Sequence, residues 1–139
     1  MASDVKITVS EANGRRRASS GSPWEPRIGY ARAVRAGDTI VVTGTVGINA
    51  DGTFPKTAGE QTRRALTIIQ AAIEGLGGRL DDVVRTRMFV TDISKWEEVG
   101  GVHGEVFAAI RPATTMVEVA RLIDDAALVE IEADVIVAR

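Results

Sequence analysis

Hydrophobic and acidic residues alternate one by one near the C-terminus, over residues 129–135. Successive side chains of a strand point to opposite faces, so this segment predicts a strand with Glu130, Glu132 and Asp134 on one face. Residues 114–122 predict a second strand, joined to the first by a hairpin connection. Three neighbouring carboxylates need cations or solvent, so we expect this side of the sheet to be wet, charged or shared between subunits.

Four further strands are predicted from alternating or β-branched runs. They cover residues 5–10, 30–35, 38–46 and 83–91. The second and third form a hairpin that turns at Ala36 and Gly37. Gly44 interrupts the β-branched run of the third strand, which indicates a bulge, a close approach of a ligand or another backbone, or a simple packing bend.

Two helices are predicted from apolar residues at helical spacing. Thr57 and Glu60 form a capping box before the first helix, which ends at Gly77 and Gly78. Its apolar stripe consists of Ala65, Ile68, Ile69, Ala72, Ile73 and Leu76. The sequence therefore predicts an amphipathic helix that packs on the sheet.

Ser94 and Glu97 predict a second capping box, and the helix that follows ends before Pro112. Its apolar stripe consists of Trp96, Val99, His103, Val106, Phe107 and Ile110. His103 within such a stripe is either a core residue or part of a site, and the core is the more frequent case. Glu105 falls on the opposite face of the helix, so these two residues form no dyad there.

Residues 11–27 are rich in Gly, Ser, Arg and Pro, which predicts a loop. The run Arg15, Arg16 and Arg17 is either a phosphate-binding element or, more commonly, a solvated face. Trp24 is a large side chain within this polar segment. It is expected to cover a ligand cleft or to contact a neighbouring subunit, because both remove its ring from water.

The 139 residues are long enough for one domain, 1–139, with a single core. The net charge of −2 gives no general attraction for nucleic acid or membranes, so we expect neither as a partner. The chain has no cysteine, which excludes disulfides and thiolate metal sites. Without an apolar leader or a long apolar run, it is expected to be a soluble, cytoplasmic protein.

Arg85 and Arg87 share one face of the strand over residues 83–91. If this strand lies beside the last one, the two arginines pair with its acidic face. A structural ion pair is the first interpretation of these arginines, and a catalytic role the second.

The segment PATTMVEVARL followed by VEIEA resembles the C-terminal signature of the Rid family. These are YjgF-like reactive intermediate deaminases that act on imines and enamines, once named L-PSP endoribonucleases. The segments GYARAVRAGDTIVVTGTVGI and VVRTRMFVTDISKWEEV are similar to the family's early hairpin and central strand. The resemblance extends from about Ile28 to Arg139. It implies an α+β, chorismate-mutase-like fold, with a mixed six-stranded sheet, two helices on one face, and a homotrimeric assembly.

The resemblance also implies a small-molecule cleft at each subunit boundary, with neither metal nor organic cofactor. Active relatives hydrolyse compounds such as 2-aminoacrylate to a ketoacid and ammonia. The positions that match the family's site are Tyr30, Thr43, Gly44, Thr45, Thr114, Met116 and Glu130. We add Thr115 and Trp24 to the substrate-binding candidates and assign Glu130 as the catalytic candidate.

Thr114 departs from the family pattern, in which an arginine after the Pro-Ala pair binds the substrate carboxylate. The loss of such a charge-assisted contact is worth about 2 to 5 kcal/mol, enough to change the substrate class. Gly100 stands where the pattern has asparagine, and Thr45 where it has glutamine. Whether Arg111 or the run Arg15 to Arg17 supplies a replacement cation stays open at this stage.

Glu130 either activates the hydrolytic water, if burial raises its pKa, or forms a structural salt bridge with Arg85 or Arg87. The sequence accordingly supports two hypotheses: an imine or enamine hydrolase of altered specificity, and a trimer that binds a metabolite or a partner without turnover. A ribonuclease ranks last, because the charge balance and the few aromatic residues provide no platform for nucleic acid.

Overall fold

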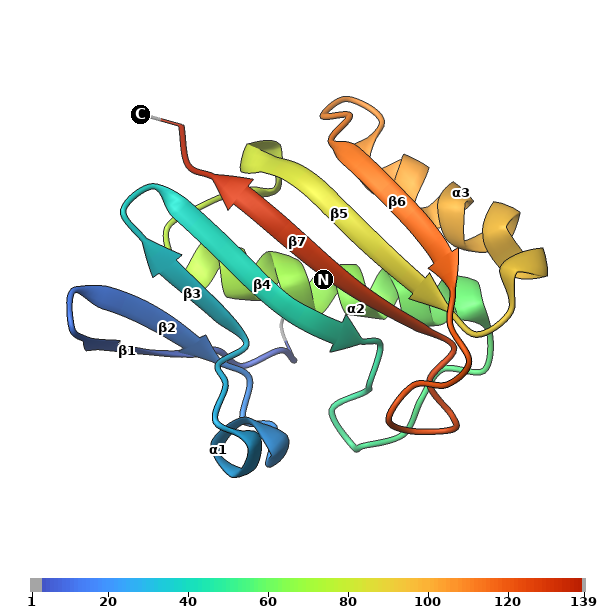
Figure 1. The fold of residues 1–139 in the computed structure, drawn as a ribbon, viewed down its shortest axis with the longest axis horizontal. Coiled ribbons are helices and arrows are strands. Elements are labelled where there is room, and N and C mark those ends of the chain that lie inside the picture. The colour runs from blue at the N-terminus through green and yellow to red at the C-terminus, as the bar shows by residue number, and fades with distance from the viewer. Residues whose placement is uncertain (1–3, 139) are drawn as a thin grey trace.

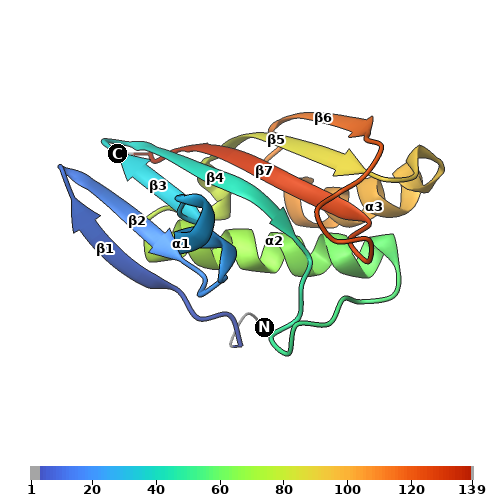
Figure 2. The same ribbon diagram turned by 60° about the horizontal axis from the view of Figure 1, so that its bottom comes forward.

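The computed structural model describes residues 4–138, which form a mixed seven-stranded sheet with α2 and α3 on one face (Figures 1 and 2). The sheet order is β1-β2-β3-β4-β7-β5-β6. The strands are β1 Thr8–Ala12, β2 Arg15–Ser19, β3 Ala33–Ala36, β4 Thr39–Val46, β5 Val83–Val90, β6 Ala113–Glu118 and β7 Val129–Ile136. The helices are α1 Trp24–Ile28, α2 Ala58–Gly75 and α3 Trp96–Phe107, with single 3-10 turns at Leu80–Asp82 and Ile93–Lys95.

The α+β class and the mixed sheet with α2 and α3 on one face are confirmed, whereas the strand count of six is wrong. The seventh strand comes from residues 11–27, where a loop was expected. Asn13 and Gly14 both have positive φ, at 57° and 74°, and form the turn between β1 and β2. An Asn-Gly pair is a strong hairpin signal. It was not recognised because the residues that follow it are rich in arginine, serine and glycine, a composition typical of loops.

The hairpin of β3 and β4 is confirmed, with Gly37 at positive φ in its turn. Of the alternatives left open for Gly44, the structure shows a bulge, because the pairing of β4 with β7 shifts register between Val42 and Thr45. The extra residue re-aims the end of β4 relative to β7.

The predicted hairpin between the two C-terminal strands is wrong, because β5 lies between β6 and β7. β6 runs parallel to β5 at the edge of the sheet, and α3 connects them (Figure 1). Parallel neighbours require such a crossover, and sequence alternation alone does not report which strand lies beside which. The strand expected over residues 114–122 also ends early, at Glu118.

The Thr57 cap of α2 is confirmed: its Oγ1 accepts a hydrogen bond from the Glu60 backbone N–H at 3.1 Å. The second capping box is wrong, because Asp92 accepts the Ser94 backbone N–H at 3.0 Å and α3 begins only at Trp96. Trp96 is 56% exposed instead of lying in the apolar stripe of α3.

The hydrophobic core lies between the sheet and the helices α2 and α3, and β7 contributes Val129, Ile131, Ala133 and Val135 to it. Figure 1 looks onto the other face of the sheet, which no long helix covers. Within residues 4–138, no helix is both long enough and apolar enough to cross a membrane.

Candidate functional site

Thr114 and Glu130 lie on opposite faces of the sheet. Thr114 is paired with Thr86, whose hydroxyl is buried under α3, and the two Oγ atoms are 2.7 Å apart. Glu130 lies on the acidic face of β7. The residues between the acidic ones point to the opposite face, where the helices bury them. A single copy of the chain therefore does not bring these two candidates into one site.

The first group of candidates surrounds the bulge of β4, and we call it the charged half-site: Tyr30, Arg32, Gly44, Thr45 and Glu130. A Cβ atom at residue 44 would overlap the carboxyl group of Glu130. Glycine is thus required here by the close approach of a side chain from β7. The glycine therefore marks a bulge, and the space left by its missing side chain holds the Glu130 carboxyl group.

Arg32 is a residue of this half-site that the sequence analysis missed. Its Nη1 donates hydrogen bonds to the Gly44 carbonyl at 2.9 Å and to Thr45 Oγ1 at 3.2 Å. Its guanidinium also lies over the Tyr30 ring, 5.5 Å from the centroid. Arg32 is only 7% exposed. The available signal was an arginine between two alanines in a predicted strand, a pattern that suits a buried, paired cation.

Glu25 on α1 compensates the charge of Arg32, with a carboxylate oxygen 3.6 Å from its Nε. Burial acts to raise the pKa of Glu25, but hydrogen bonds from Ser20 and Ser19 and the charge of Arg32 outweigh it and lower that pKa. The Ser19 and Ser20 hydroxyls donate at 2.7 and 2.6 Å. Glu25 therefore stays ionised and holds Arg32 against the bulge.

Glu130 is the carboxylate of this half-site without an ion pair. Arg87 Nη1 lies 3.4 Å from Glu132 and 3.2 Å from Asp134, and no ion pair within the described chain reaches Glu130. Burial raises the pKa of Glu130, the Glu132 carboxylate raises it further, and Arg32 opposes both. The predicted salt bridge of Glu130 with Arg85 or Arg87 is therefore wrong. The predicted pairing of Arg87 with the acidic face of β7 is confirmed.

The second group, which we call the neutral half-site, consists of Thr114, Met116 and Gly100 with Thr86 and His103 behind them. A Cβ at Gly100 of α3 would lie 3.9 Å from the Met116 methyl carbon. His103 Nε2 is 2.8 Å from Thr86 Oγ1. Burial lowers the pKa of His103, so its imidazole is neutral near pH 7.

Glu105 forms an exposed ion pair with Arg63 of α2 at 2.6 Å, so it does not act with His103 within one copy. Thr115 is paired with Arg87 and lies on the open face, away from Thr114. Thr43 donates to the Ala31 carbonyl at 2.6 Å and supports the hairpin beside Tyr30.

A cavity of about 450 Å³ lies next to the charged half-site, and Tyr30, Thr43 and Arg17 are among its lining residues.

Trp24 of α1 is 39% exposed and stacks against Arg27 at 4.9 Å. Arg16 donates to the Leu76 carbonyl, and Arg111 is exposed with φ 57°. Among the described residues, the Thr114 side chain has a hydrogen bond with Thr86 and none with an arginine.

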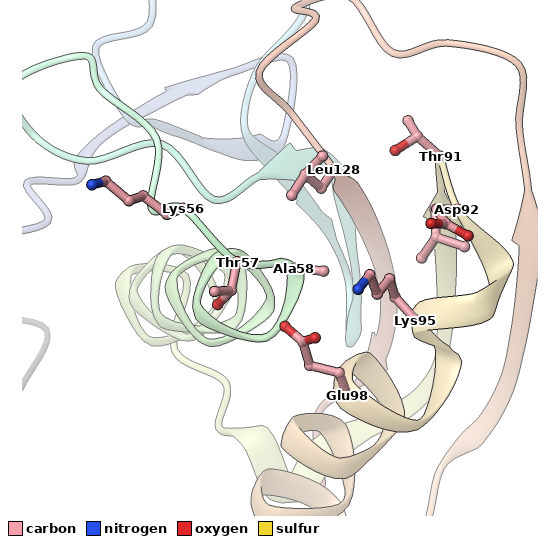
Figure 3. Close-up of a pocket in the computed structure, with 9 residues that line it drawn as sticks. Lys56, Thr57, Ala58, Thr91, Asp92, Lys95, Glu98 and Leu128 are labelled. Atoms are coloured by element: carbon pink, nitrogen blue, oxygen red, sulfur yellow. The ribbon is translucent and has the colours of Figure 1, made fainter.

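A second cavity, of about 200 Å³, lies between the first turn of α2 and the start of α3 (Figure 3). Glu98 points from α3 toward that turn and accepts the Gly59 backbone N–H at 2.6 Å. The N-terminus of α2 is thus already occupied by a carboxylate of the same chain. None of the residues predicted for the site lines this cavity.

Comparison with known proteins gives a consistent family. Residues 21–137 match the profile of the family described as Endoribonuclease L-PSP. The crystal structure of Rv2704 from Mycobacterium tuberculosis, a member of the YjgF/YER057c/UK114 family, shares 51% identity with a TM-score of 0.83. The match covers 88% of this chain and 99% of that one.

Two curated relatives are similar over most of their length. The Streptomyces coelicolor protein SCO2049 is 38% identical over 120 residues, which are 86% of this chain and 90% of the relative. The Escherichia coli K12 protein named 2-iminobutanoate/2-iminopropanoate deaminase is 33% identical over 108 residues. These cover 75% of this chain and 84% of the deaminase.

Proposed function

The chain belongs to the endoribonuclease L-PSP family, which includes imine deaminases, and we propose that it hydrolyses small imines or enamines as a homotrimer. Each site would form where the charged half-site of one copy meets the neutral half-site of the next. The observation that carries this proposal is Glu130, a half-buried carboxylate with a raised pKa and no ion pair within the described chain.

Assembly is supported by the placement of the candidates. Thr114 and Glu130 lie on opposite faces of one sheet, so a site that uses both needs a second copy. The face of the sheet that no long helix covers also exposes the apolar side chains of Val41 and Val117, at 47% and 42%, and a second copy would remove them from water.

The charged half-site would perform the chemistry. Water adds to the C=N carbon while Glu130 accepts one of its protons and passes it to the nitrogen, which gives a carbinolamine. The C–N bond then breaks as Glu130 transfers the proton of the new hydroxyl to the nitrogen, which leaves as ammonia, and the hydroxyl oxygen becomes the carbonyl of the product. The raised pKa of Glu130 makes its carboxylate a stronger proton acceptor than that of an ordinary glutamate. Arg32 and Gly44 would hold Glu130 and the bulge in position.

The neutral half-site would bind the polar end of the substrate through Thr114, with Met116 beside it. Backbone N–H groups near Gly44 would contact the substrate from the other copy, with Tyr30, Thr43 and Thr45 supporting the bulge. Thr115 and Trp24, on the open face and on α1, would border the interface instead of the reacting centre.

A binding protein without turnover is the second candidate. It is favoured by Thr114 and Gly100, two positions of the neutral half-site where the family's site pattern has arginine and asparagine. Such a trimer would hold a metabolite in the same cleft, and the ligand would be recovered unchanged.

The test is an assay in which imines with and without a carboxylate are generated in solution and the release of ammonia and of the carbonyl product is followed. We expect acceleration by the protein, and a loss of about 100-fold or more in Glu130→Gln. Glu132→Gln is the matched control, because Glu132 lies on the same face of β7 but contacts Arg87. We expect this variant to keep its rate within a few fold.

Light scattering of the same preparations reports the assembly. A monomer at assay concentrations contradicts a shared site. A panel of imines, with and without carboxylates, that shows no acceleration contradicts the hydrolase, and ligands recovered unchanged then favour the binding protein.

A further inference from the structure

Three neutral polar groups form a continuous hydrogen-bonded chain from the core to the exposed edge strand β6. His103 on α3 and Thr86 on β5 are buried, at 8% and 0% exposure, whereas Thr114 is exposed. The distances are 2.8 Å from His103 Nε2 to Thr86 Oγ1 and 2.7 Å from Thr86 Oγ1 to Thr114 Oγ1. Nothing in the proposed reaction uses His103 or Thr86, so this relay needs its own explanation.

The number of hydroxyl and imidazole protons in this relay decides whether Thr114 can donate a hydrogen bond to a ligand or can only accept one. Each threonine hydroxyl carries one proton, and neutral His103 carries one on either nitrogen. If Nε2–H donates to Thr86, and Thr86 donates to Thr114, the Thr114 proton is left for an external acceptor. The reverse order would leave only lone pairs at Thr114. We adopt the first arrangement, in which the Thr86 hydroxyl donates to Thr114 Oγ1.

We propose that Thr114 donates its hydroxyl proton to an uncharged oxygen at the end of the ligand, such as an amide carbonyl in place of a carboxylate, and that His103 orients it through Thr86. This inference rests on the proposed function, because it names the ligand class of that same cleft. His103 and Thr86 are positioning residues, since neither reaches the ligand.

A carboxylate is a poor ligand for this relay. All three groups are neutral, and no arginine among the described residues forms a hydrogen bond with the Thr114 side chain. A carboxylate that leaves water for a single hydroxyl loses more solvation than it regains, whereas a carbonyl exchanges one hydrogen bond for another. The relay therefore favours a neutral hydrogen-bond acceptor over a carboxylate as the group that binds Thr114.

The experiment compares two probes of nearly equal shape, pyruvate and pyruvamide. Titration of protein labelled at the methionine methyl groups reports binding at Met116, one of only three methionines in the chain. We expect wild-type protein to bind pyruvamide at least about tenfold more tightly than pyruvate. Thr114→Val, which keeps the shape and removes the hydroxyl, should weaken pyruvamide binding roughly fivefold and leave pyruvate unchanged.

Variants of His103 test the relay itself. In His103→Gln, the side-chain amide still donates to Thr86, so the pyruvamide affinity should stay within about twofold of wild type. In His103→Leu the donor is absent, and the affinity should fall roughly threefold or more, while the pyruvate affinity does not change. A merely structural role for His103 would weaken both probes together. Thr114→Arg should reverse the preference toward pyruvate.

The outcomes separate this inference from the proposed function. If wild-type protein binds pyruvate as tightly as pyruvamide, or neither probe, the ligand class is wrong. The hydrolase nevertheless stands in that case if Glu130→Gln still abolishes turnover. If His103→Gln and His103→Leu behave alike, the positioning role is wrong. If pyruvamide is preferred but no imine is hydrolysed, the relay stands and the hydrolase fails.

Discussion

The charged and neutral half-sites hold their polar side chains in place in two different ways. Near β4, the Arg32 cation is held by the Glu25 carboxylate, and Glu130 is left without an ion pair among the described residues. Near β6, the neutral side chains of His103, Thr86 and Thr114 are linked in a row by two hydrogen bonds. Under the proposed function, the charged half-site would transfer protons, and the neutral half-site would bind a ligand by the direction of its hydrogen bonds.

Removal of Arg32 gives the largest expected effect on this comparison. Arg32→Met leaves the Glu25 carboxylate buried without its cation and frees the Gly44 carbonyl. We expect a loss of about 3 kcal/mol in the free energy of unfolding. Urea denaturation at a fixed protein concentration measures it, because assembly contributes to apparent stability.

Arg63→Met is the matched control for Arg32→Met. Arg63 forms an ion pair with Glu105, but the two side chains are 56% and 61% exposed. Its removal should therefore cost less than about 1 kcal/mol. Equal losses in the two variants would show that the charged half-site is not built around a buried pair.

Gly44→Ala tests the approach of Glu130 to the bulge. The new methyl group would displace the Glu130 carboxyl group, so we expect turnover to fall by about 10- to 100-fold, with a stability loss of about 1 kcal/mol. Gly104→Ala on α3 is the control, because no atom lies within 4 Å of the new Cβ there. It should keep turnover and gain up to about 1 kcal/mol. Unchanged turnover in Gly44→Ala would remove Glu130 from the reacting centre.

The pH dependence of stability gives the smallest effect and has opposite signs in the two half-sites. The pKa of Glu130 is raised by burial, so its contribution to stability is present below the unfolded value of 4.5 and is lost as the pH rises through the folded pKa. The pKa of His103 is lowered by burial, so stability falls as the pH drops below the unfolded value of 6.5.

Thermal unfolding of Glu130→Gln and His103→Gln from pH 7.5 to 5 separates these contributions. Glu130→Gln should have a Tm about 2–4 °C above wild type at neutral pH, and this gain should shrink as the pH falls. His103→Gln should lose less Tm than wild type on acidification. A constant difference across the pH range for either variant contradicts the corresponding shift.

Local patterns predicted most of the elements. The alternation in β7 and the Thr57 cap of α2 are confirmed. Errors arose where two local signals competed. The Asn13-Gly14 turn was hidden in a segment rich in arginine and serine, and Asp92 took the capping role expected of Ser94.

The sequence by itself determined the α+β class, the acidic face of β7 and the family, because side-chain periodicity and motif spacing depend on neighbours in the chain. Only the tertiary structure placed β5 between β6 and β7, separated Thr114 from Glu130, and joined Arg32 to Glu25. Strand order and burial arise from contacts between distant segments, and a pattern within one segment does not contain its partner.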